Sequence, residues 1–325
     1  MMKIALLDDY QGVALGLADW PSLAPDAEVT VFPDHVAALD ALVERLLPFQ
    51  CVVLMRERTP FPRALLARLP KLKLLITSGR RNAAIDVAAA SEHGVQVSGT
   101  DLKGLGTAEL TWGLIFALVR QIVAEDRALR QGRWQTTLGV ELAGKTLGLL
   151  GLGRLGGEVA RVGAAFGMKP VAWSPNLAAD RAAAAGARLV TKDELFAEAD
   201  ILSIHLVLSE RTAGLVGAAD LARMKRGAFL VNTSRGPIVD EAALVASLRD
   251  HRIAGAGIDV FVTEPLPPGH PFFGLDNLVM TPHLGYVTAE NYAYHFPQVV
   301  AIIRAFLGGQ AMKAINAPPA AAARG

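Results

Sequence analysis

The segment that most constrains this chain is Gly151-Leu-Gly-Arg-Leu-Gly156, which directly follows an apolar run from Thr146 to Leu150. A stretch of helical period then continues to Phe166, and Gly167 ends it. A G-x-G-x-x-G match is weak by itself in a glycine-rich chain, but strand, tight turn and helix in this order specify one βα unit. The chain is therefore expected to build at least one parallel α/β sheet.

Each glycine of this segment has a physical role in such a unit. Gly151 permits the tight turn, Gly153 lets the backbone approach a pyrophosphate, and Gly156 lets helix and strand pack closely. The N–H groups at the helix start would face the anion. The segment predicts a dinucleotide-binding turn, and the alternative is an ordinary glycine-rich βα turn.

The end of the next strand bears on which dinucleotide binds. An acidic residue about 20 positions after the glycines normally holds the ribose hydroxyls, but this strand ends in Trp173-Ser174-Pro175-Asn176. Ser174 removes a carboxylate that would repel a 2′-phosphate, and the only nearby cation is Arg181. NAD and NADP both remain open.

Short apolar runs alternate with helical stretches along the whole chain, which predicts two doubly wound parallel-sheet domains. The expected strands are Ile4 to Leu7, Val29 to Phe32, Cys51 to Met55, Leu74 to Thr77 and Val95 to Val97, then Thr146 to Leu150, Val171 to Trp173, Ile201 to His205, Phe229 to Asn232, Ala256 to Val260 and Leu278 to Thr281. The expected helices are Ala37 to Leu47, Ala64 to Leu69, Ile85 to Glu92, Thr107 to Arg120, Gly156 to Phe166, Asp193 to Ala197, Ala219 to Met224 and Glu241 to Asp250.

Composition excludes several classes of protein. With 52% hydrophobic and 19% charged residues, the 325-residue chain can fill two cores. Its net charge of +1 provides no global field for nucleic acid or anionic lipid. The single cysteine, Cys51, excludes an internal disulfide, and no thiolate metal set is present, so we expect no metal and a reducing cytoplasm.

Hydrophobic segments predict neither a signal peptide nor a membrane span. The apolar start, Ile4 to Leu7, is short and closed by acids, and the longest run elsewhere, Leu110 to Val119, is about half of what a span needs. The expected helix Thr107 to Arg120 is apolar nearly all round, so we expect it in a core or at a homodimer interface. The Ala/Pro-rich end, Ala317 to Gly325, is expected to be a frayed tail.

Reactive side chains gather at the predicted strand ends of the second series, where an open parallel sheet binds its ligands. Reduction of a carbonyl by hydride needs a proton donor, an orienting carboxylate and a cation. His283, Glu264 and Arg235 supply these, each after a different strand. Taken singly, each is more often a surface charge or an ordinary histidine, so the hypothesis depends on their joint placement.

Taken together, these segments resemble the D-isomer-specific 2-hydroxyacid dehydrogenase family, and are close in pattern to short forms of D-3-phosphoglycerate dehydrogenase. The matching segments are Met55-Arg-Glu-Arg-Thr59, Ala108-Glu-Leu, Gly144-Lys-Thr-Leu-Gly-Leu-Leu-Gly151, Asn232-Thr-Ser-Arg-Gly-Pro-Ile-Val-Asp-Glu241, Gly257-Ile-Asp-Val-Phe261, Glu264-Pro265 and Thr281-Pro-His-Leu-Gly285. Several ordered motifs at family-like spacings are more specific than one glycine pattern.

The resemblance implies a flavodoxin-like substrate-binding domain split between residues 1–100 and 288–325, around a Rossmann cofactor domain at 101–287, with a small 2-oxo or D-2-hydroxy acid bound in the cleft. It implies that His283 is the acid and base, that Glu264 orients its ring and raises its pKa, and that Arg235 grips the substrate. The implied cofactor residues are Gly151, Gly153, Arg154, Leu155, Gly156, Ser174, Leu206, Thr233, Ser234 and Asp259, the last meeting the nicotinamide amide.

The implied substrate-binding residues are Arg56, Ser78, Gly79, Arg80 and Arg235. This chain departs from the family where a glycine-rich loop reads Thr77-Ser-Gly-Arg-Arg-Asn82, so Arg80 and Arg81 either admit another anionic group or project into solvent. Tyr286 stands in for a smaller residue and could narrow the pocket, and Leu206 and Val207 replace the usual proline.

The leading hypothesis is an NAD(P)-dependent dehydrogenase of D-2-hydroxy acids. Two alternatives stay open on the same fold. One is a dinucleotide-sensing interaction protein, like the corepressor branch that resembles these dehydrogenases. The other is a pseudoenzyme with Arg80, Arg81 and Tyr286 blocking the cleft.

Overall fold

The strands of this protein form two separate parallel sheets, one of five strands and one of seven. The computed structural model describes residues 1–316, so the expected tail from Ala317 to Gly325 lies outside the described residues. The chain divides into two units: unit 1 comprises Met1–Gly104 together with the described residues from Ala289 onward, and unit 2 is Leu105–Thr288. Both units are α/β, which confirms the predicted fold class.

The sheet of unit 1 has the order β2-β1-β3-β4-β5, and all of its strand pairs are parallel. This is the flavodoxin-like order. Its strands are β1 (Met2–Leu6), β2 (Ala27–Val31), β3 (Cys51–Leu54), β4 (Leu74–Thr77) and β5 (Gln96–Gly99). Strands β3, β4 and β5 are buried on both faces, as expected of apolar runs without alternation.

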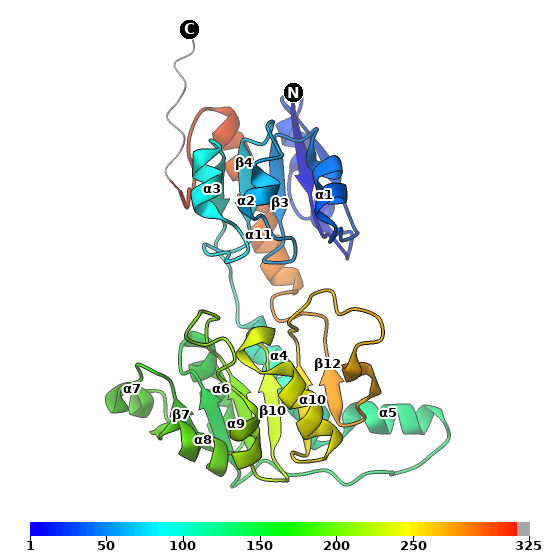
Figure 1. Cartoon of the computed structure of the whole chain (residues 1–325), viewed down its shortest axis with the longest axis vertical. Coiled ribbons are helices and arrows are strands. Elements are labelled where there is room, and N and C mark those ends of the chain that lie inside the picture. The colour runs from blue at the N-terminus through cyan, green and yellow to red at the C-terminus, as the bar shows by residue number, and fades with distance from the viewer. Residues whose placement is uncertain (317–325) are drawn as a thin grey trace. The chain divides into compact units, whose positions relative to one another are not determined.

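Helices α1 (Leu39–Leu46), α2 (Arg63–Leu66) and α3 (Val87–Glu92) lie in front of this sheet in Figure 1, and α11 (Ala289–Leu307) lies behind it. One cluster joins Leu42, Leu65 and Ala89 of the front helices to side chains of the strands. Phe296 and Ile303 of α11 are fully buried. Two short 3₁₀ turns, η1 (Ala14–Gly16) and η2 (Trp20–Leu23), connect β1 to β2.

The sheet of unit 2 has the order β12-β11-β10-β9-β6-β7-β8, with parallel pairs throughout. Its strands are β6 (Thr146–Leu150), β7 (Lys169–Trp173), β8 (Arg188–Leu189), β9 (Ile201–Ile204), β10 (Phe229–Asn232), β11 (Gly255–Ile258) and β12 (Leu278–Met280). The chain reverses direction across the sheet between β6 and β9. In doubly wound sheets the ligand crevice lies at this switch, beyond the carboxyl ends of the strands.

Both faces of this sheet are covered by helices, which are α4 (Gly106–Val119), α5 (Ile122–Arg130), α6 (Arg154–Ala165), α7 (Ala179–Ala184), α8 (Lys192–Glu198), α9 (Ala218–Arg223) and α10 (Glu241–Arg249), with 3₁₀ turns η3 (Gly236–Ile238) and η4 (Pro271–Gly274). Side chains of α8, α9 and α10 pack with one face of the strands. Side chains of α4 and α6 pack with the other. The sheet therefore has an apolar core on each side.

Helix α4 is buried by its own unit. Leu114, Ile115 and Leu118 belong to the core that α4 shares with α6 and the sheet. Gly257 of β11 lets the helix approach closely, because a Cβ there would lie 3.1 Å from Leu114 Cβ. The sequence predicts this apolar helix either in a core or at a homodimer interface. The core of unit 2 accounts for its burial without an interface.

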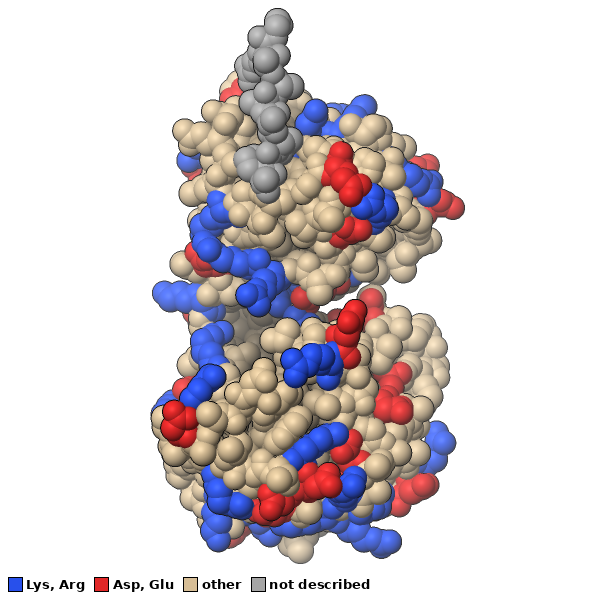
Figure 2. Space-filling view, turned by 60° about the vertical axis from the view of Figure 1, so that its left-hand side comes forward, with Lys and Arg blue, Asp and Glu red and all other residues tan. Residues whose placement is uncertain are grey.

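No single helix in the part of the chain that the structure describes has the length and hydropathy of a membrane span. Helices α4 and α5 pass that test only as a pair, and they are bent by 59° at the break between them. Acidic and basic side chains both occur on each unit over the face drawn in Figure 2.

Candidate active site

The glycine-rich segment forms the turn between β6 and α6. Gly151 has φ +105°, and a Cβ there would lie 2.8 Å from the carbonyl carbon and oxygen of His205, which follows β9. A Cβ on Gly156 would lie 2.2 Å from the Gly151 oxygen. Both positions therefore require glycine, one for its conformation and one for the close approach of helix to turn.

Gly153 differs, because a Cβ there would meet nothing within 4 Å. It is the N-cap of α6, so the helix begins at Arg154 and not at Gly156 as expected. The N–H groups of Arg154, Leu155 and Gly156 lie in its first turn, ahead of the bond from Gly157 N to Gly153 O. Open space in front of a helix N-terminus fits a pyrophosphate, so these residues suit a dinucleotide.

The neighbouring strand ends supply the other side of this region. Ser174 follows β7, and Leu206 lies two residues after β9. The Ser234 hydroxyl donates a hydrogen bond to the Leu206 carbonyl, so two predicted cofactor residues are joined directly. Thr233 is buried and its hydroxyl lies 2.8 Å from the Thr111 hydroxyl on α4.

Asn232, the last residue of β10, orders the loop that follows it, and sequence reasoning did not single it out. Its side-chain oxygen accepts from Ser234 N at 3.0 Å, and its amide donates to the Arg235 carbonyl at 3.0 Å. The Arg235 guanidinium in turn donates to the Ser234 carbonyl at 2.7 Å. The backbone that carries Arg235 is thus fixed by side-chain bonds.

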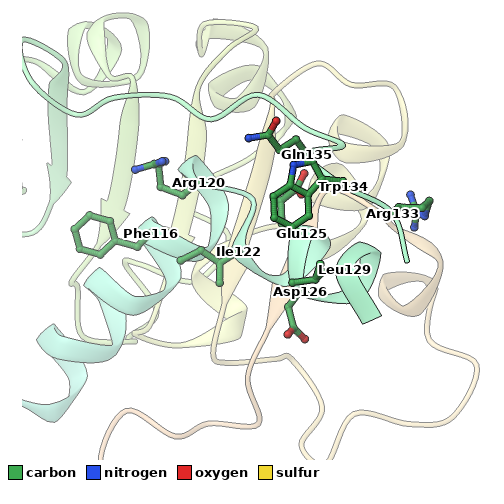
Figure 3. Close-up of a pocket in the computed structure, with 9 residues that line it drawn as sticks. All are labelled: Phe116, Arg120, Ile122, Glu125, Asp126, Leu129, Arg133, Trp134 and Gln135. Atoms are coloured by element: carbon green, nitrogen blue, oxygen red, sulfur yellow. The ribbon is translucent and has the colours of Figure 1, made fainter. Parts of the chain in front are cut away.

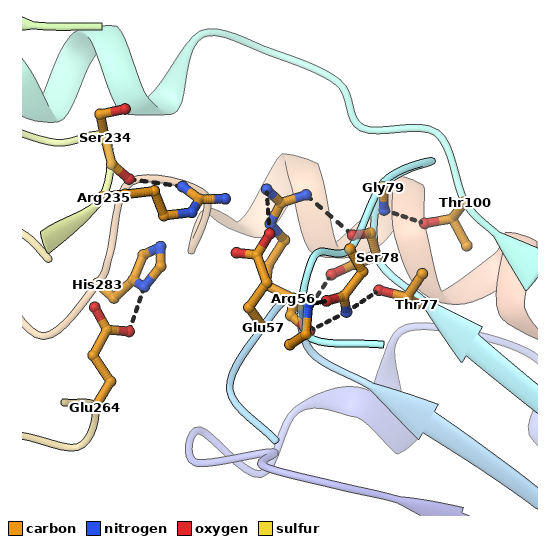
Figure 4. Close-up of polar contacts among 12 residues, drawn as sticks. Arg56, Glu57, Thr77, Ser78, Gly79, Thr100, Ser234, Arg235, Glu264 and His283 are labelled. Atoms are coloured by element: carbon orange, nitrogen blue, oxygen red, sulfur yellow. Dashed lines mark hydrogen bonds and ion pairs between the residues drawn. The ribbon is translucent and has the colours of Figure 1, made fainter. Parts of the chain in front are cut away.

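His283 and Glu264 form a hydrogen-bonded pair in unit 2 (Figure 4). The distance from His283 Nδ1 to Glu264 Oε2 is 2.7 Å, and the side chains are only 15% and 26% exposed. The other carboxylate oxygen, Oε1, accepts from Phe261 N at 2.9 Å. His283 has φ +54°, a left-handed conformation that is uncommon for non-glycine residues and is concentrated at functional sites.

Electrostatics keep Glu264 ionised. Burial alone would raise the pKa of its carboxyl, but the hydrogen bond and charge of His283, the Phe261 N–H and the charge of Arg235 together hold that pKa below its ordinary value. An ionised carboxylate only accepts hydrogen bonds, so His283 Nδ1 is the donor and Nε2 is the nitrogen left for proton transfer.

Asp259 follows β11 and is completely buried. Its Oδ1 accepts from the Thr281 hydroxyl at 2.6 Å and from Leu284 N at 2.7 Å, and its Oδ2 accepts from Gly285 N at 2.9 Å. These bonds brace the loop on both sides of His283. Burial raises the pKa of Asp259, although the three donors act in the opposite direction.

The side chain of Tyr286 packs against that of His283. Its ring meets that of His283 edge to face, with centroids 5.5 Å apart at 83°. The tyrosine therefore limits rotation of the imidazole in addition to occupying space. Its predicted effect on the size of the pocket stays a prediction.

The predicted substrate-binding residues Arg56, Ser78 and Gly79 come together in unit 1 (Figure 4). Arg56 follows β3, and its guanidinium Nη1 donates to the Ser78 carbonyl at 3.1 Å. Gly79 has φ +90°, and a Cβ there would lie 2.5 Å from Arg56 Nη1. Gly79 N donates to the Thr100 hydroxyl at 3.3 Å.

Arg80 and Arg81 differ in their surroundings. The Arg80 guanidinium is 70% exposed and lies 3.0 Å from Asp101. Asp101 also accepts from Lys313 at 2.7 Å, so two cations share one carboxylate. Arg81 is exposed. Arg80 therefore has a structural contact, whereas Arg81 faces solvent.

No group of three or more His, Cys, Asp or Glu side chains among residues 1–316 is arranged to hold a metal ion. A separate groove of about 660 Å³ is formed within unit 2 by α4, α5 and the segment after α5 (Figure 3). Its lining includes Phe116, Ile122, Leu129 and Trp134. None of the predicted site residues lines it.

Comparison with known proteins gives a consistent set of relatives. The family described as "D-isomer specific 2-hydroxyacid dehydrogenase, NAD binding domain" matches residues 112–285. The glyoxylate reductase of Aeropyrum pernix is 42% identical over 237 residues, which cover 70% of this chain and 71% of that protein. The D-3-phosphoglycerate dehydrogenase of Mycobacterium tuberculosis is 39% identical over 294 residues, which cover 86% of this chain.

This chain spans only 56% of the length of the mycobacterial enzyme. Among solved structures, the phosphoglycerate oxidoreductase of Vibrio cholerae is similar with a TM-score of 0.89 and 40% identity. That alignment covers 94% of this chain and all of the other. The likeness therefore extends over both units and not only over the glycine-rich turn.

Proposed function

We propose that this chain, which belongs to the D-isomer specific 2-hydroxyacid dehydrogenase family, interconverts a small 2-oxo acid and the corresponding D-2-hydroxy acid with His283 as the acid and base. The observation that carries the proposal is the 2.7 Å bond between His283 Nδ1 and the ionised Glu264 carboxylate. This pair leaves the other imidazole nitrogen free for proton transfer, beside a sheet edge suited to a dinucleotide.

The chain's own residues would move the proton. When bound, the reduced nicotinamide supplies the hydride that reaches the carbonyl carbon. His283 Nε2 donates a proton to the carbonyl oxygen, and Glu264 stabilises the ring in the orientation that this requires. In the reverse direction His283 accepts the hydroxyl proton, and the same carboxylate stabilises the imidazolium that forms.

Arg235 would bind the carboxylate of the substrate and polarise its carbonyl group. Its charge already acts on Glu264, and Asn232 and the Ser234 carbonyl hold its loop and its guanidinium. A planar cation suits a carboxylate or the oxygen of a polarised carbonyl. We assign substrate binding in unit 1 to Arg56, Ser78, Gly79 and Arg80, and dinucleotide binding to unit 2.

We propose that Ser174 allows the site to accept either form of the cofactor. The matching family is described as an NAD binding domain, but the carboxylate that favours NAD is replaced by Ser174 in this chain. Without it, a 2′-phosphate meets no repulsion at this strand end. We therefore expect NADPH to be accepted as well as NADH.

The experiment is a substrate panel with each reduced cofactor. Purified protein is mixed with glyoxylate, hydroxypyruvate, pyruvate and 3-phosphohydroxypyruvate, and loss of reduced-cofactor absorbance is followed. Turnover that disappears in His283→Ala supports the proposal. If no acid in the panel is reduced while the dinucleotide still binds, a sensing protein or a pseudoenzyme is favoured instead.

We further propose that the active form is a homodimer that uses α5 and the segment after it. Trp134 and Leu138 are 76% and 94% exposed, and Ile122 and Leu129 add apolar surface in the lining of the groove of Figure 3. A concentration of large apolar side chains on one exposed segment is typical of an interface. Sedimentation of wild type against Trp134→Lys tests this, and a wild-type monomer at micromolar concentration would remove the proposal.

A further inference from the structure

We infer that Asn82 is a positioning residue that fixes Arg56 for recognition of the substrate's acid group. The inference rests on the proposed function, in which Arg56 belongs to the substrate-binding residues of unit 1, and it assigns to Arg56 a share in binding the acid group. Asn82 lies at the end of the loop that follows β4, in the segment where the chain departs from its family pattern. Its side chain connects this loop to the end of β3.

Arg56 occupies a conformation that needs outside support. Its φ is +55°, in the left-handed region that non-glycine residues seldom adopt. Strand β3 ends at Leu54, so the ladder no longer constrains this residue. The backbone N–H of Arg56 instead donates to the Ser78 hydroxyl at 2.9 Å.

Asn82 supplies the complementary bond. Its side-chain Nδ2 donates to the Arg56 carbonyl at 2.7 Å and to the Thr77 hydroxyl at 2.9 Å. Its Oδ1 accepts from Ala84 N at 2.9 Å. Because two donors and one acceptor are matched, the orientation of the carboxamide is defined, and the Arg56 backbone is held at both N–H and C=O.

The held backbone determines where the guanidinium lies. Arg56 Nη1 bonds to the Ser78 carbonyl and lies over Gly79, whose missing side chain leaves it room. The Arg56 side chain is only 17% exposed. A rotation of the Arg56 backbone would move this cation away from the Ser78-Gly79 segment, so Asn82 acts on substrate binding through Arg56.

A matched control exists in the same unit. Asn316 makes the same three kinds of bond: Oδ1 accepts from Val97 N at 2.8 Å, and Nδ2 donates to the Val95 carbonyl at 2.8 Å and the Ser91 hydroxyl at 2.9 Å. Ser91 and Val95 precede β5 and Val97 is its second residue, so these partners lie at the opposite end of the strand from Thr100. Asn316→Ala therefore removes equivalent bonds without touching Arg56.

The test measures glyoxylate reduction and melting temperature for Asn82→Ala, Asn316→Ala, Arg56→Ala and the double variant Asn82→Ala/Arg56→Ala. We expect Asn82→Ala to raise KM for glyoxylate about 10- to 100-fold, with kcat and the KM for the cofactor within about threefold of wild type. Asn316→Ala should leave all three constants unchanged at a similar loss of melting temperature. In the Arg56→Ala background, Asn82→Ala should add less than about twofold.

Two results would overturn the inference: an unchanged KM in Asn82→Ala, or the same fold-increase with and without Arg56. If wild type reduces no acid, the proposed function fails, and the positioning claim is judged separately from crystal structures of wild type and Asn82→Ala. Loss of the positive φ at Arg56 in the variant supports it. A positive φ retained in the variant refutes it.

Discussion

Replacing Glu264 by glutamine tests the proposed chemistry most directly. Both partners of the carboxylate, His283 Nδ1 and Phe261 N, donate hydrogen bonds to it. A glutamine has only one acceptor oxygen, so it cannot satisfy both donors. The substitution therefore removes the negative charge and also one of the two bonds.

The size of the effect follows from these contacts. A hydrogen bond to a charged group contributes about 1.5–3 kcal/mol, and opposite charges about 4 Å apart interact by about 4 kcal/mol at an effective dielectric constant of 20. Because glutamine retains one neutral hydrogen bond, we expect the transition state that involves the imidazolium of His283 to lose about 3 kcal/mol of stabilisation. That corresponds to a decrease of roughly 100-fold in kcat/KM.

The control is a second histidine–glutamate pair in the same unit. His270 Nε2 lies 3.0 Å from Glu241 Oε1, and those side chains are 13% and 27% exposed, almost the same as His283 and Glu264. Glu241→Gln thus perturbs an equivalent pair outside the proposed chemistry. Steady-state reduction of glyoxylate and cofactor binding by fluorescence are measured for both variants.

We expect Glu264→Gln to keep its affinity for the cofactor and to lose turnover, whereas Glu241→Gln keeps both. Equal losses in the two variants would mean that the effect is structural. A Glu264→Gln enzyme within threefold of wild type would refute the reasoning that the carboxylate supports proton transfer.

Three further predictions concern separate parts of the molecule. Arg235→Ala should remove about 3 kcal/mol or more of transition-state stabilisation, which lowers kcat/KM roughly 100-fold or more with unchanged cofactor binding; steady-state kinetics check this, and unchanged efficiency would remove Arg235 from its role. Ser174→Asp should lower kcat/KM for NADPH at least about tenfold relative to NADH, because a carboxylate there repels the 2′-phosphate; a constant ratio would contradict the assignment. Burial lowers the pKa of His205 and of His295 from 6.5 to about 4. Between these pH values the unfolded state binds more protons than the folded state. The free energy of unfolding should therefore fall as the pH falls from 6.5 to about 4. Urea unfolding measures this loss, and His295→Gln should make it smaller.

The family resemblance and the fold class were predictable because their signals are local, and the comparisons and the sheets confirm them. Turn chemistry and strand period place β6, its glycine turn and the following helix correctly. The start of α6 at Arg154 was missed by two residues, because Gly153 and not Leu155 caps the helix. Strand β8, only Arg188–Leu189, has too few residues to show a period.

Helix α5 shows a limit of sequence patterns. It is separated from α4 by Arg120 and Gln121, and the break is made by Gln121 at φ +54°. Neither Gly nor Pro marks this position, so the sequence carries no ordinary signal for it. The sequence therefore does not predict the exposed apolar side chains that follow α4, such as Ile122 and Leu129.

In the candidate site, the sequence predicts the side chains proposed to react, together with the carboxylate that bonds to His283, but not the asparagines that hold the loops around them. His283, Glu264 and Arg235 stand out because few side chains perform that chemistry at strand ends. Asn82 and Asn232 bond mainly to backbone atoms of neighbouring loops. Such partners depend on the three-dimensional course of the chain, which residue spacing does not record.

Asp259 illustrates how one side chain can satisfy a sequence pattern for a different reason. The resemblance implies a contact with the nicotinamide amide, but a carboxylate has about four acceptor positions and three are filled by Thr281, Leu284 and Gly285. These donors flank His283, whose left-handed backbone needs such support. The same carboxylate therefore fixes the loop that carries His283, because its three bonds to that loop form without a cofactor.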